Sequence, residues 1–143
     1  MLTSTMRNPL AGKRVLLGVG GSIAAYRACD VVRRLREAGA TVRVAPTRAA
    51  AAFVTPLTFE ALSGEPCLGG VLEVAGGKIP HVEEAHAVDV ALVAAATADL
   101  LAKMAHGLAD EALYATLLAF PGPVMVAPAM ESHMWTHAAT QAN

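Results

Sequence analysis

Aromatic and charged residues are both scarce in this chain. Of its 143 residues, 4% are aromatic and 16% are charged, and the formal net charge is -1. So small a charge gives no general electrostatic attraction to nucleic acid or to an anionic membrane surface, and we predict neither partner. The hydrophobic share is 55%, which predicts a filled core together with surface that partner subunits bury.

Cysteines and long apolar runs are also few. Cys29 and Cys67 are the two cysteines, and they do not have the spacing of a metal site, so we predict no metal. Free thiols are typical of cytoplasmic proteins, and that location is the expectation. No apolar run approaches the ~20 residues of a membrane span. Residues 1–12 lack a signal-peptide core and are expected to form a lead-in to one domain over residues 13–143.

The stretch VLLGVGGSIAAY, residues 15–26, organises the rest of the sequence. An apolar run typical of a strand passes through glycines into the start of a helix. Gly20 and Gly21 can adopt positive φ and have no Cβ to block an approaching group, so free N–H groups there favour an anion such as phosphate. Ser22 can cap the helix or donate its hydroxyl. The pattern lacks both the P-loop lysine and the third glycine of a dinucleotide site, so a tight turn without a ligand stays open.

Strand and helix patterns alternate along the remaining chain, which predicts an α/β fold. The expected class is a three-layer α/β/α sandwich with a doubly wound, Rossmann-like parallel sheet. The segments typical of strands are 15–19, 41–45, 89–94 and 124–127. Helices are expected over 23–38, 47–53, 56–63, 80–88, 100–106 and 110–119, and another opens near residue 136. Residues 67–75 are expected to form an edge strand or a loop. Either Thr97 or Asp99 is expected to cap the helix over 100–106.

Four irregular segments of small or polar residues begin where the predicted strands stop. They are residues 20–23, 46–49, 95–100 and 128–131. Ligands of parallel α/β sheets bind at the carboxyl ends of the strands, where the strand order reverses. The four segments together therefore predict a ligand site, and a flat, phosphorylated cofactor suits it.

Several motifs in order resemble one known family. GGSIAAY, PLTFEALSG, IPHVE, LVAAATADLLAKMAHGLADEAL and APAMESHMW follow one another as in the homo-oligomeric FMN-containing cysteine decarboxylases. This family, which the chain resembles over residues 13–143, includes phosphopantothenoylcysteine decarboxylase and peptidyl-cysteine decarboxylases of peptide natural products. The resemblance implies FMN as cofactor and a cysteine-containing small molecule or peptide C-terminus as substrate. It also implies a homotrimer, or a dodecamer built from trimers.

The resemblance also assigns roles to individual residues. His81 matches the active-site histidine, which in the family reaches a flavin across a subunit boundary and is the candidate base; the other four histidines are expected on the surface or in structural roles. Glu131 stands where the family has an asparagine that binds the substrate carboxylate. The residues matching the family's flavin-binding segments are Gly21, Ser22, Ile23, Thr47, Arg48, Ala49, Thr97, Ala98, Asp99, Leu100, Ala129 and Met130.

The implied reaction is flavin oxidation of the thiol-bearing carbon, followed by loss of CO2 to give an enethiol. A carboxylate at Glu131 would repel the substrate carboxylate unless it is protonated or paired with a cation. A flavin-binding protein with impaired catalysis and an assembly or regulatory role is therefore the alternative. A prenyl-FMN synthase relative shares the fold but fits the His81 and Met134-Trp135 segments less well. The family's reducing cysteine, on a flap expected beyond Asn143, matches neither cysteine of this chain.

Overall fold

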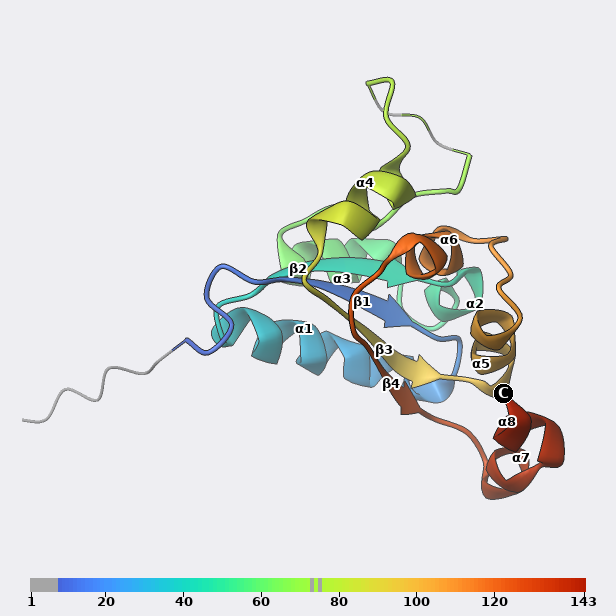
Figure 1. The fold of residues 1–143 in the computed structure, drawn as a ribbon. Helices are drawn as coiled ribbons and strands as arrows, with labels where there is room; N and C mark the ends of the chain where they lie inside the picture. The colour runs from blue at the N-terminus through green and yellow to red at the C-terminus, as the bar shows by residue number, and fades with distance from the viewer. Residues whose placement is uncertain (1–7, 73, 75) are drawn as a thin grey trace, which may run out of the picture.

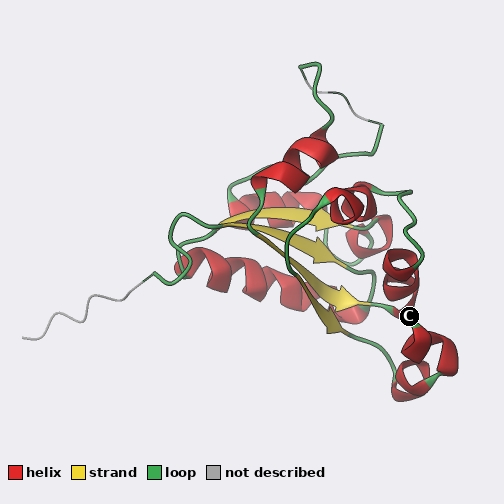
Figure 2. Ribbon diagram, in the orientation of Figure 1, coloured by secondary structure: helices red, strands yellow, loops and turns green. Residues whose placement is uncertain are grey.

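A four-stranded parallel sheet separates two helical layers in the computed structural model, which describes residues 8–72, 74 and 76–143 (Figures 1 and 2). The strand order is β2-β1-β3-β4. The strands are β1 (Arg14–Val19), β2 (Thr41–Pro46), β3 (Val90–Ala96) and β4 (Val124–Pro128). All point the same way, so their carboxyl ends meet at one edge of the sheet (Figure 2). The predicted three-layer α/β class is confirmed.

Helices cover the two faces of the sheet unequally. One face carries η1 (Ile23–Tyr26), α1 (Arg27–Glu37), α2 (Arg48–Ala51) and α3 (Pro56–Ser63). The other carries α4 (Pro80–Ala87), α5 (Ala98–Ala105) and α6 (Ala112–Ala119). Two short helices, α7 (Ser132–Thr136) and α8 (Ala138–Ala142), follow β4 beyond the carboxyl ends of the strands (Figure 1). None of the helices in the described ranges is long and apolar enough to cross a membrane.

Alternating side chains divide the core into two clusters. Val15, Leu17 and Val19 of β1 pack with α1 and α3, whereas Leu16 faces α4, α5 and α6. Successive side chains of a strand point to opposite faces, so a strand covered on both sides is apolar at nearly every position. This burial explains why the run from Val15 to Val19 is apolar without interruption.

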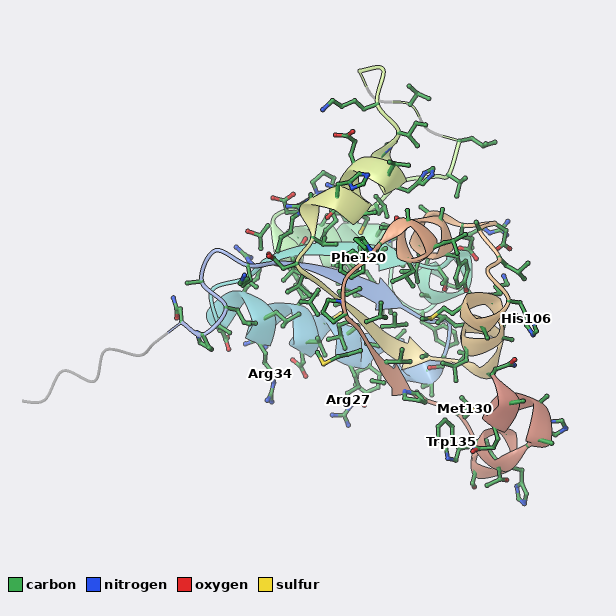
Figure 3. The ribbon with its side chains drawn as sticks, in the orientation of Figure 1. Arg27, Arg34, His106, Phe120, Met130 and Trp135 are labelled. Atoms are coloured by element: carbon green, nitrogen blue, oxygen red, sulfur yellow. The ribbon has the colours of Figure 1, made fainter. Side chains whose placement is uncertain are left out.

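The last strand is far less covered than the first three. All five residues of β4 are exposed, and Met125 at 58% is the most exposed of its apolar side chains. Leu118 of α6 and Trp135 of α7 are exposed beside it. Figure 3 shows Met130 and Trp135 between β4 and α7, and Arg27 and Arg34 on the side of α1 that faces away from the sheet. Arg27, Arg33, Arg34 and Arg36 are all exposed, so the charged face of α1 is in solvent.

Most helix limits agree with the sequence prediction, and the structure decides two alternatives left open there and adds one helix. Thr97, and not Asp99, caps α5: its hydroxyl accepts the N–H of Leu100 at 3.1 Å. Residues 67–72 form no strand, so the loop alternative is correct there, while residues 73 and 75 lie outside the described residues. Helix α7 was not predicted, and it forms because the Glu131 carboxylate caps it. Of the predicted lead-in, residues 8–12 form turns in which Leu10 N–H donates to Ala38 O.

Candidate functional site

The strand order reverses between β1 and β3. The chain leaves β1 towards β2 on one side of the sheet, and it leaves β3 towards β4 on the other. The loops that follow these two strands therefore diverge and leave a crevice between them, which is where parallel α/β sheets bind ligands. The irregular segments predicted after β1 and β3 lie on either side of this crevice.

Gly20 packs directly on the end of β3. Its N–H donates to Ala94 O at 3.0 Å, and a Cβ at this position would overlap the carbonyl oxygen of Ala95. Ala95 has φ +52°, the one positive φ outside glycine in the described residues, and the β3–β4 register shifts between Val93 and Ala96. A β-bulge at Ala95 thus turns its carbonyl towards Gly20, at a conformational cost of about 1–2 kcal/mol for a residue with a Cβ.

Gly21 packs in the same way on α2. A Cβ there would overlap the Ala49 Cβ and lie 2.8 Å from the Ala49 carbonyl carbon. Neither Gly20 nor Gly21 has a positive φ, so neither uses the left-handed conformation that glycine permits. The space that a side chain would need at Gly20 and Gly21 is therefore taken by Ala95 and Ala49 of neighbouring segments of the protein itself. We call the contacts Gly20–Ala95 and Gly21–Ala49 the glycine interlock.

Beside the glycine interlock lies a cavity of about 300 Å³, which we call the switch-point cavity. Seven of the predicted cofactor-binding residues line it: Gly21, Thr47, Ala49, Thr97, Ala98, Asp99 and Leu100. Glu111, Tyr114 and Met134 complete its lining. Segments that follow β1, β2 and β3 therefore meet at one cavity, although they are separated by up to about half of the chain.

Thr47 and Thr97 have equivalent positions on two sides of the cavity. The Thr47 hydroxyl accepts the N–H of Ala50 at 3.0 Å, just as Thr97 accepts that of Leu100. The first N–H groups of a helix have no partner inside it, and the Thr97 hydroxyl satisfies one of them. The N–H groups of Ala98 and Asp99 stand at the N-terminal end of α5, and this end of the helix lines the cavity. Ser22 caps η1 by accepting from Ala24 N–H at 3.3 Å.

An ionic cluster borders the α5–α6 side of the cavity. Lys103 Nζ lies 3.1 Å from Asp110 Oδ2, 3.8 Å from Asp99 Oδ2 and 5.1 Å from the centre of the Tyr114 ring. The hydrogen bond to Asp110 raises the pKa of Lys103, and the bond from Lys103 lowers the pKa of Asp110. Burial raises the pKa of Tyr114, so its phenol stays neutral beside the cavity. Lys103 is thus shared by two carboxylates, Asp99 and Asp110, so this wall is hydrogen-bonded and carries a small net negative charge.

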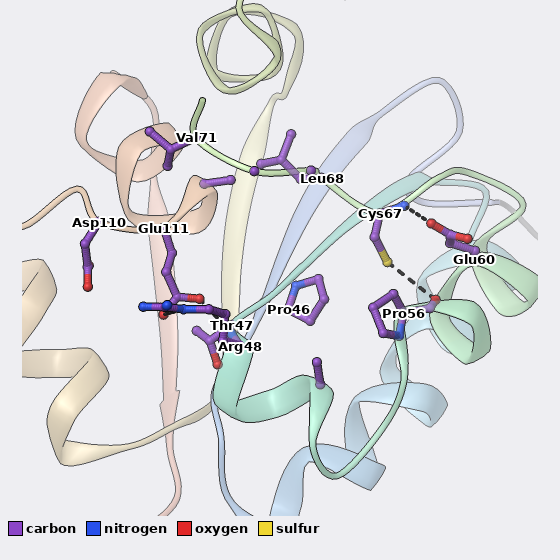
Figure 4. A pocket seen from close by; sticks show the side chains of 14 residues that line it. Pro46, Thr47, Arg48, Pro56, Glu60, Cys67, Leu68, Val71, Asp110 and Glu111 are labelled. Carbon is purple, nitrogen blue, oxygen red and sulfur yellow. Dashed lines mark hydrogen bonds and ion pairs between the residues drawn. The ribbon is translucent and has the colours of Figure 1, made fainter. Parts of the chain in front are cut away.

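A second cavity of about 460 Å³, the outer cavity, shares Thr47 and Glu111 with the first. Arg48 lines the outer cavity and not the switch-point cavity (Figure 4). Cys67 also lines it, with its N–H donating to Glu60 at 2.8 Å and its thiol 3.6 Å from Pro56 O. Burial raises the pKa of Cys67 to about 11, so this sulfur is a neutral thiol at neutral pH and a poor nucleophile.

Residues 128–131, at and directly after the end of β4, do not line the switch-point cavity, although Met134 of α7 does. Met130 lines another opening, with Pro128 and Trp135, and Ala129 is tied to β3 by its N–H bond to Ala96 O at 2.9 Å. Glu131 accepts the N–H of His133 at 2.8 Å, and its other oxygen lies 2.9 Å from His133 Nδ1. The bond with the His133 ring is the main cause of a lowered Glu131 pKa. Ile23, another predicted contact, is 75% exposed and lines neither cavity.

His81 lies on α4, on the face of the sheet opposite α1. It lines neither the switch-point cavity nor the outer cavity. Glu84, three residues later on the same helix, is buried and makes a two-pronged bond to Arg14 of β1 at 2.9 and 3.0 Å. This pair fixes α4 on the sheet. The Nδ1 atom of His81 is buried and has no hydrogen-bond partner among the described residues.

Sequence reasoning missed three residues that line the switch-point cavity. Glu111 and Tyr114 were assigned only to a helix, and Met134 only to the motif that ends the family resemblance. A charged residue directly before an apolar helix was the available signal for Glu111, since α6 begins at the same edge of the sheet. Nothing in the local sequence shows that α6 approaches α2, because the two are about 60 residues apart.

Comparisons of the sequence with known proteins identify its family. The sequence model described as Flavoprotein matches residues 3–143. The coenzyme A biosynthesis bifunctional protein CoaBC of Mycobacterium tuberculosis is 53% identical over 132 residues, which are 92% of this chain and 31% of that protein. The corresponding protein of Escherichia coli is 48% identical over 135 residues, 94% of this chain and 33% of that protein. The chain thus spans about a third of the length of these curated relatives.

Solved structures of decarboxylases have a fold similar to that of this chain. The FMN-dependent cysteine decarboxylase SpaF has a TM-score of 0.87 and 37% identity, over 93% of this chain and 77% of that one. A PPC decarboxylase mutant complexed with pantothenoylaminoethenethiol has a TM-score of 0.77 and 28% identity, over 91% and 74% of the two chains. The family model covers nearly the whole chain, so the chain belongs to the Flavoprotein family, and the resemblance predicted from its ordered motifs is confirmed.

Proposed function

We propose that this chain is an FMN-dependent decarboxylase that converts a cysteine carboxylate to an enethiol. The observation that carries the proposal is the switch-point cavity, where seven residues matched to the family's flavin segments meet. The substrate is a cysteine-containing small molecule, such as phosphopantothenoylcysteine, or the C-terminal cysteine of a peptide. The identity to CoaBC supports the small molecule. A trimer or a dodecamer of trimers, in the cytoplasm, is part of the same proposal.

The residues of the switch-point cavity fit FMN. The glycine interlock leaves backbone, and no bulky side chain, at the ends of β1 and β3. The N–H groups of Ala98 and Asp99 suit an anionic oxygen, and Thr47 and Thr97 fix the helix starts around it. Ala49, Leu100 and Met134 supply apolar contacts for a flat ring. Bound FMN would supply the two-electron acceptor that lets the thiol-bearing carbon become an electron sink for decarboxylation.

His81 is proposed to move a proton at the substrate thiol. Its buried Nδ1 has no partner among residues 8–72, 74 and 76–143, which supports a role outside local structure, since buried polar atoms are nearly always bonded. Because His81 lines neither cavity of its own chain, the proposal places it at the flavin of a neighbouring subunit. The bond between Glu84 and Arg14 holds α4, and with it His81, rigidly against the sheet.

Incubation with substrates tests the proposed reaction. The purified full-length protein should be yellow, and it should remove the mass of CO2 from phosphopantothenoylcysteine or from a peptide ending in cysteine. His81→Asn should abolish this loss while the protein stays yellow. A yellow wild-type protein that decarboxylates neither substrate would contradict the proposed activity, and a colourless one that also refuses added FMN would contradict the cofactor.

Subunit mixing tests the position of His81. A His81→Asn subunit retains its flavin site, and an Ala98→Trp subunit retains His81 but has a bulky side chain in its cavity wall. Each variant alone should be inactive. Refolding the two together should restore part of the activity if the histidine serves a neighbour's flavin, and no recovery in mixed oligomers would contradict that arrangement.

An inactive flavin-binding protein is the second candidate, and the engagement of Glu131 favours it. Both Glu131 oxygens already bond to Ser132, His133 and the start of α7, so the side chain is occupied by its own loop. The nearby His133 ring is nonetheless a cation when protonated, which would offset the repulsion of a substrate carboxylate. Glu131→Asn separates the two functions: activity that appears only in this variant identifies the native chain as the inactive type.

A further inference from the structure

We propose that Glu111 is a positioning residue for the flavin, because it clamps the start of α2 against the switch-point cavity. The inference rests on the proposed function only in taking FMN as the ligand. Glu111 Oε2 accepts the backbone N–H of Arg48 at 2.6 Å, across 63 residues of sequence. It lines both the switch-point cavity and the outer cavity, and Figure 4 shows its side chain next to Thr47 and Arg48.

The direction of the Glu111 side chain is unusual for its place in the chain. It occupies the N-cap position of α6, yet it makes no capping bond to its own helix. An N-cap side chain ordinarily satisfies a free N–H two or three residues later. Glu111 instead satisfies an N–H of α2, which is part of the segment matched to the flavin site. The Glu111 carboxylate thus bonds to α2 and not to the start of its own helix, α6.

The backbone bond, and not the ion pair, is the stronger part of this contact. The Arg48 Nε lies 3.9 Å from Glu111 Oε1, and its side chain is 82% exposed. Exposed pairs of this kind contribute little to stability. The Glu111 side chain is only 14% exposed, and a short bond from an N–H to a carboxylate is stronger than one between neutral groups.

Two contacts fix the position of α2: the glycine interlock and the bond from Arg48 to Glu111. Ala49 of α2 already packs against Gly21 with no room for one more carbon atom. Glu111 holds the preceding residue, Arg48, so α2 is fixed from two directions. Release of the bond would let Thr47 and Ala49, which both line the switch-point cavity, move away from Thr97 across it. Part of the binding free energy of the flavin would then be lost in ordering α2.

Titration of flavin-free, full-length protein with FMN tests the clamp without relying on activity. Glu111→Ala should weaken FMN binding about tenfold, the equivalent of one lost bond to a charged group. Glu111→Gln keeps an oxygen that accepts the Arg48 N–H, and it should bind within about threefold of wild type. Glu37→Ala, which removes an exposed carboxylate at the end of α1, is the matched control and should bind as wild type does.

A second pair of variants removes the N–H itself. Arg48 is the first residue of α2, where proline is well tolerated, and Thr47 has φ −67° and ψ 161°, which suit a residue before proline. Arg48→Pro should bind FMN about tenfold more weakly than Arg48→Ala, because only the proline lacks the donor. Adding Glu111→Ala to Arg48→Pro should then change the affinity no further.

The outcomes separate this inference from the proposed function. Wild-type protein that fails to bind FMN contradicts the function. Wild-type protein that binds FMN as tightly as Glu111→Ala contradicts only the clamp, as does equal loss in the alanine and glutamine variants, which would point to charge instead of position. Equal binding by Arg48→Pro and Arg48→Ala overturns it as well, and circular dichroism of each variant confirms that the comparison is between folded proteins.

Discussion

The glycine interlock and the β4–α7 segment stand at the same edge of the sheet, yet they are built in opposite ways. Gly20 and Gly21 are held so tightly that a single added carbon overlaps the neighbouring loop. Met125 is 58% exposed, and Trp135 is 45% exposed. The first region is fixed by contacts within this chain. The second presents apolar surface, so its stability depends much less on any one of its side chains.

Truncation of one large side chain in each region should show the widest contrast. Phe59 is fully buried under β2, and Phe59→Ala should lower the free energy of unfolding by about 4 kcal/mol through lost burial and the resulting void. Met125→Ala should lower it by less than about 1 kcal/mol, because its side chain is mostly in water. Urea unfolding followed by circular dichroism measures both. Similar losses in the two variants would mean that β4 is covered in solution.

An added methyl group tests the glycine interlock directly. Gly21→Ala should cost about 2 kcal/mol, because the new Cβ overlaps that of Ala49. Adding Ala49→Gly should recover only part of this loss, since the carbonyl carbon and Cα of Ala49 would remain 2.8 and 3.0 Å away. A double-mutant cycle in urea measures the coupling. Strictly additive effects would show that the two residues do not touch.

Two threonines at N-cap positions provide a smaller contrast. Thr97→Ala should cost about 1 kcal/mol, since its hydroxyl accepts a helix N–H. Thr55 also stands at an N-cap but makes no capping bond, so Thr55→Ala should change the free energy of unfolding by less than about 0.5 kcal/mol. Thermal unfolding of the two variants tests the difference, and equal shifts would contradict the assigned cap.

The smallest expected effect is a local acid transition in the β4–α7 segment. The folded pKa of Glu131 is lowered, mainly by the His133 ring, so its capping of α7 is fully present above the ordinary carboxyl pKa. The cap is lost as the pH falls below about 4.5 and through the lowered folded value. Trp135 is the one tryptophan of the chain and lies in α7, so its fluorescence should report this transition. Glu131→Gln should remove it, and an unchanged acid transition in that variant would contradict the assignment.

Much of the fold could be predicted because its signals are local. Apolar runs such as residues 15–19 mark strands buried on both faces, and Thr97 stands directly before a helix. The bulge at Ala95 could not be predicted, because alanine has no preference for positive φ and only the neighbouring strand imposes it. Nor could the contacts of Gly20 and Gly21 be predicted, because a glycine in sequence does not reveal whether a ligand or a second loop approaches it.

The sequence by itself determined the strand and helix order, the family and the set of segments that meet at the carboxyl edge, because each depends on residue type and spacing. Only the tertiary structure decided which of those segments share a cavity. Residues matched after β1, β2 and β3 line one space, whereas Met130 lines another opening and His81 lies on α4. Glu111 also lines that space, and it bonds to Arg48, 63 residues away. Contacts of this kind arise because α6 and α2 pack against one sheet, and no pattern in the local sequence predicts that packing.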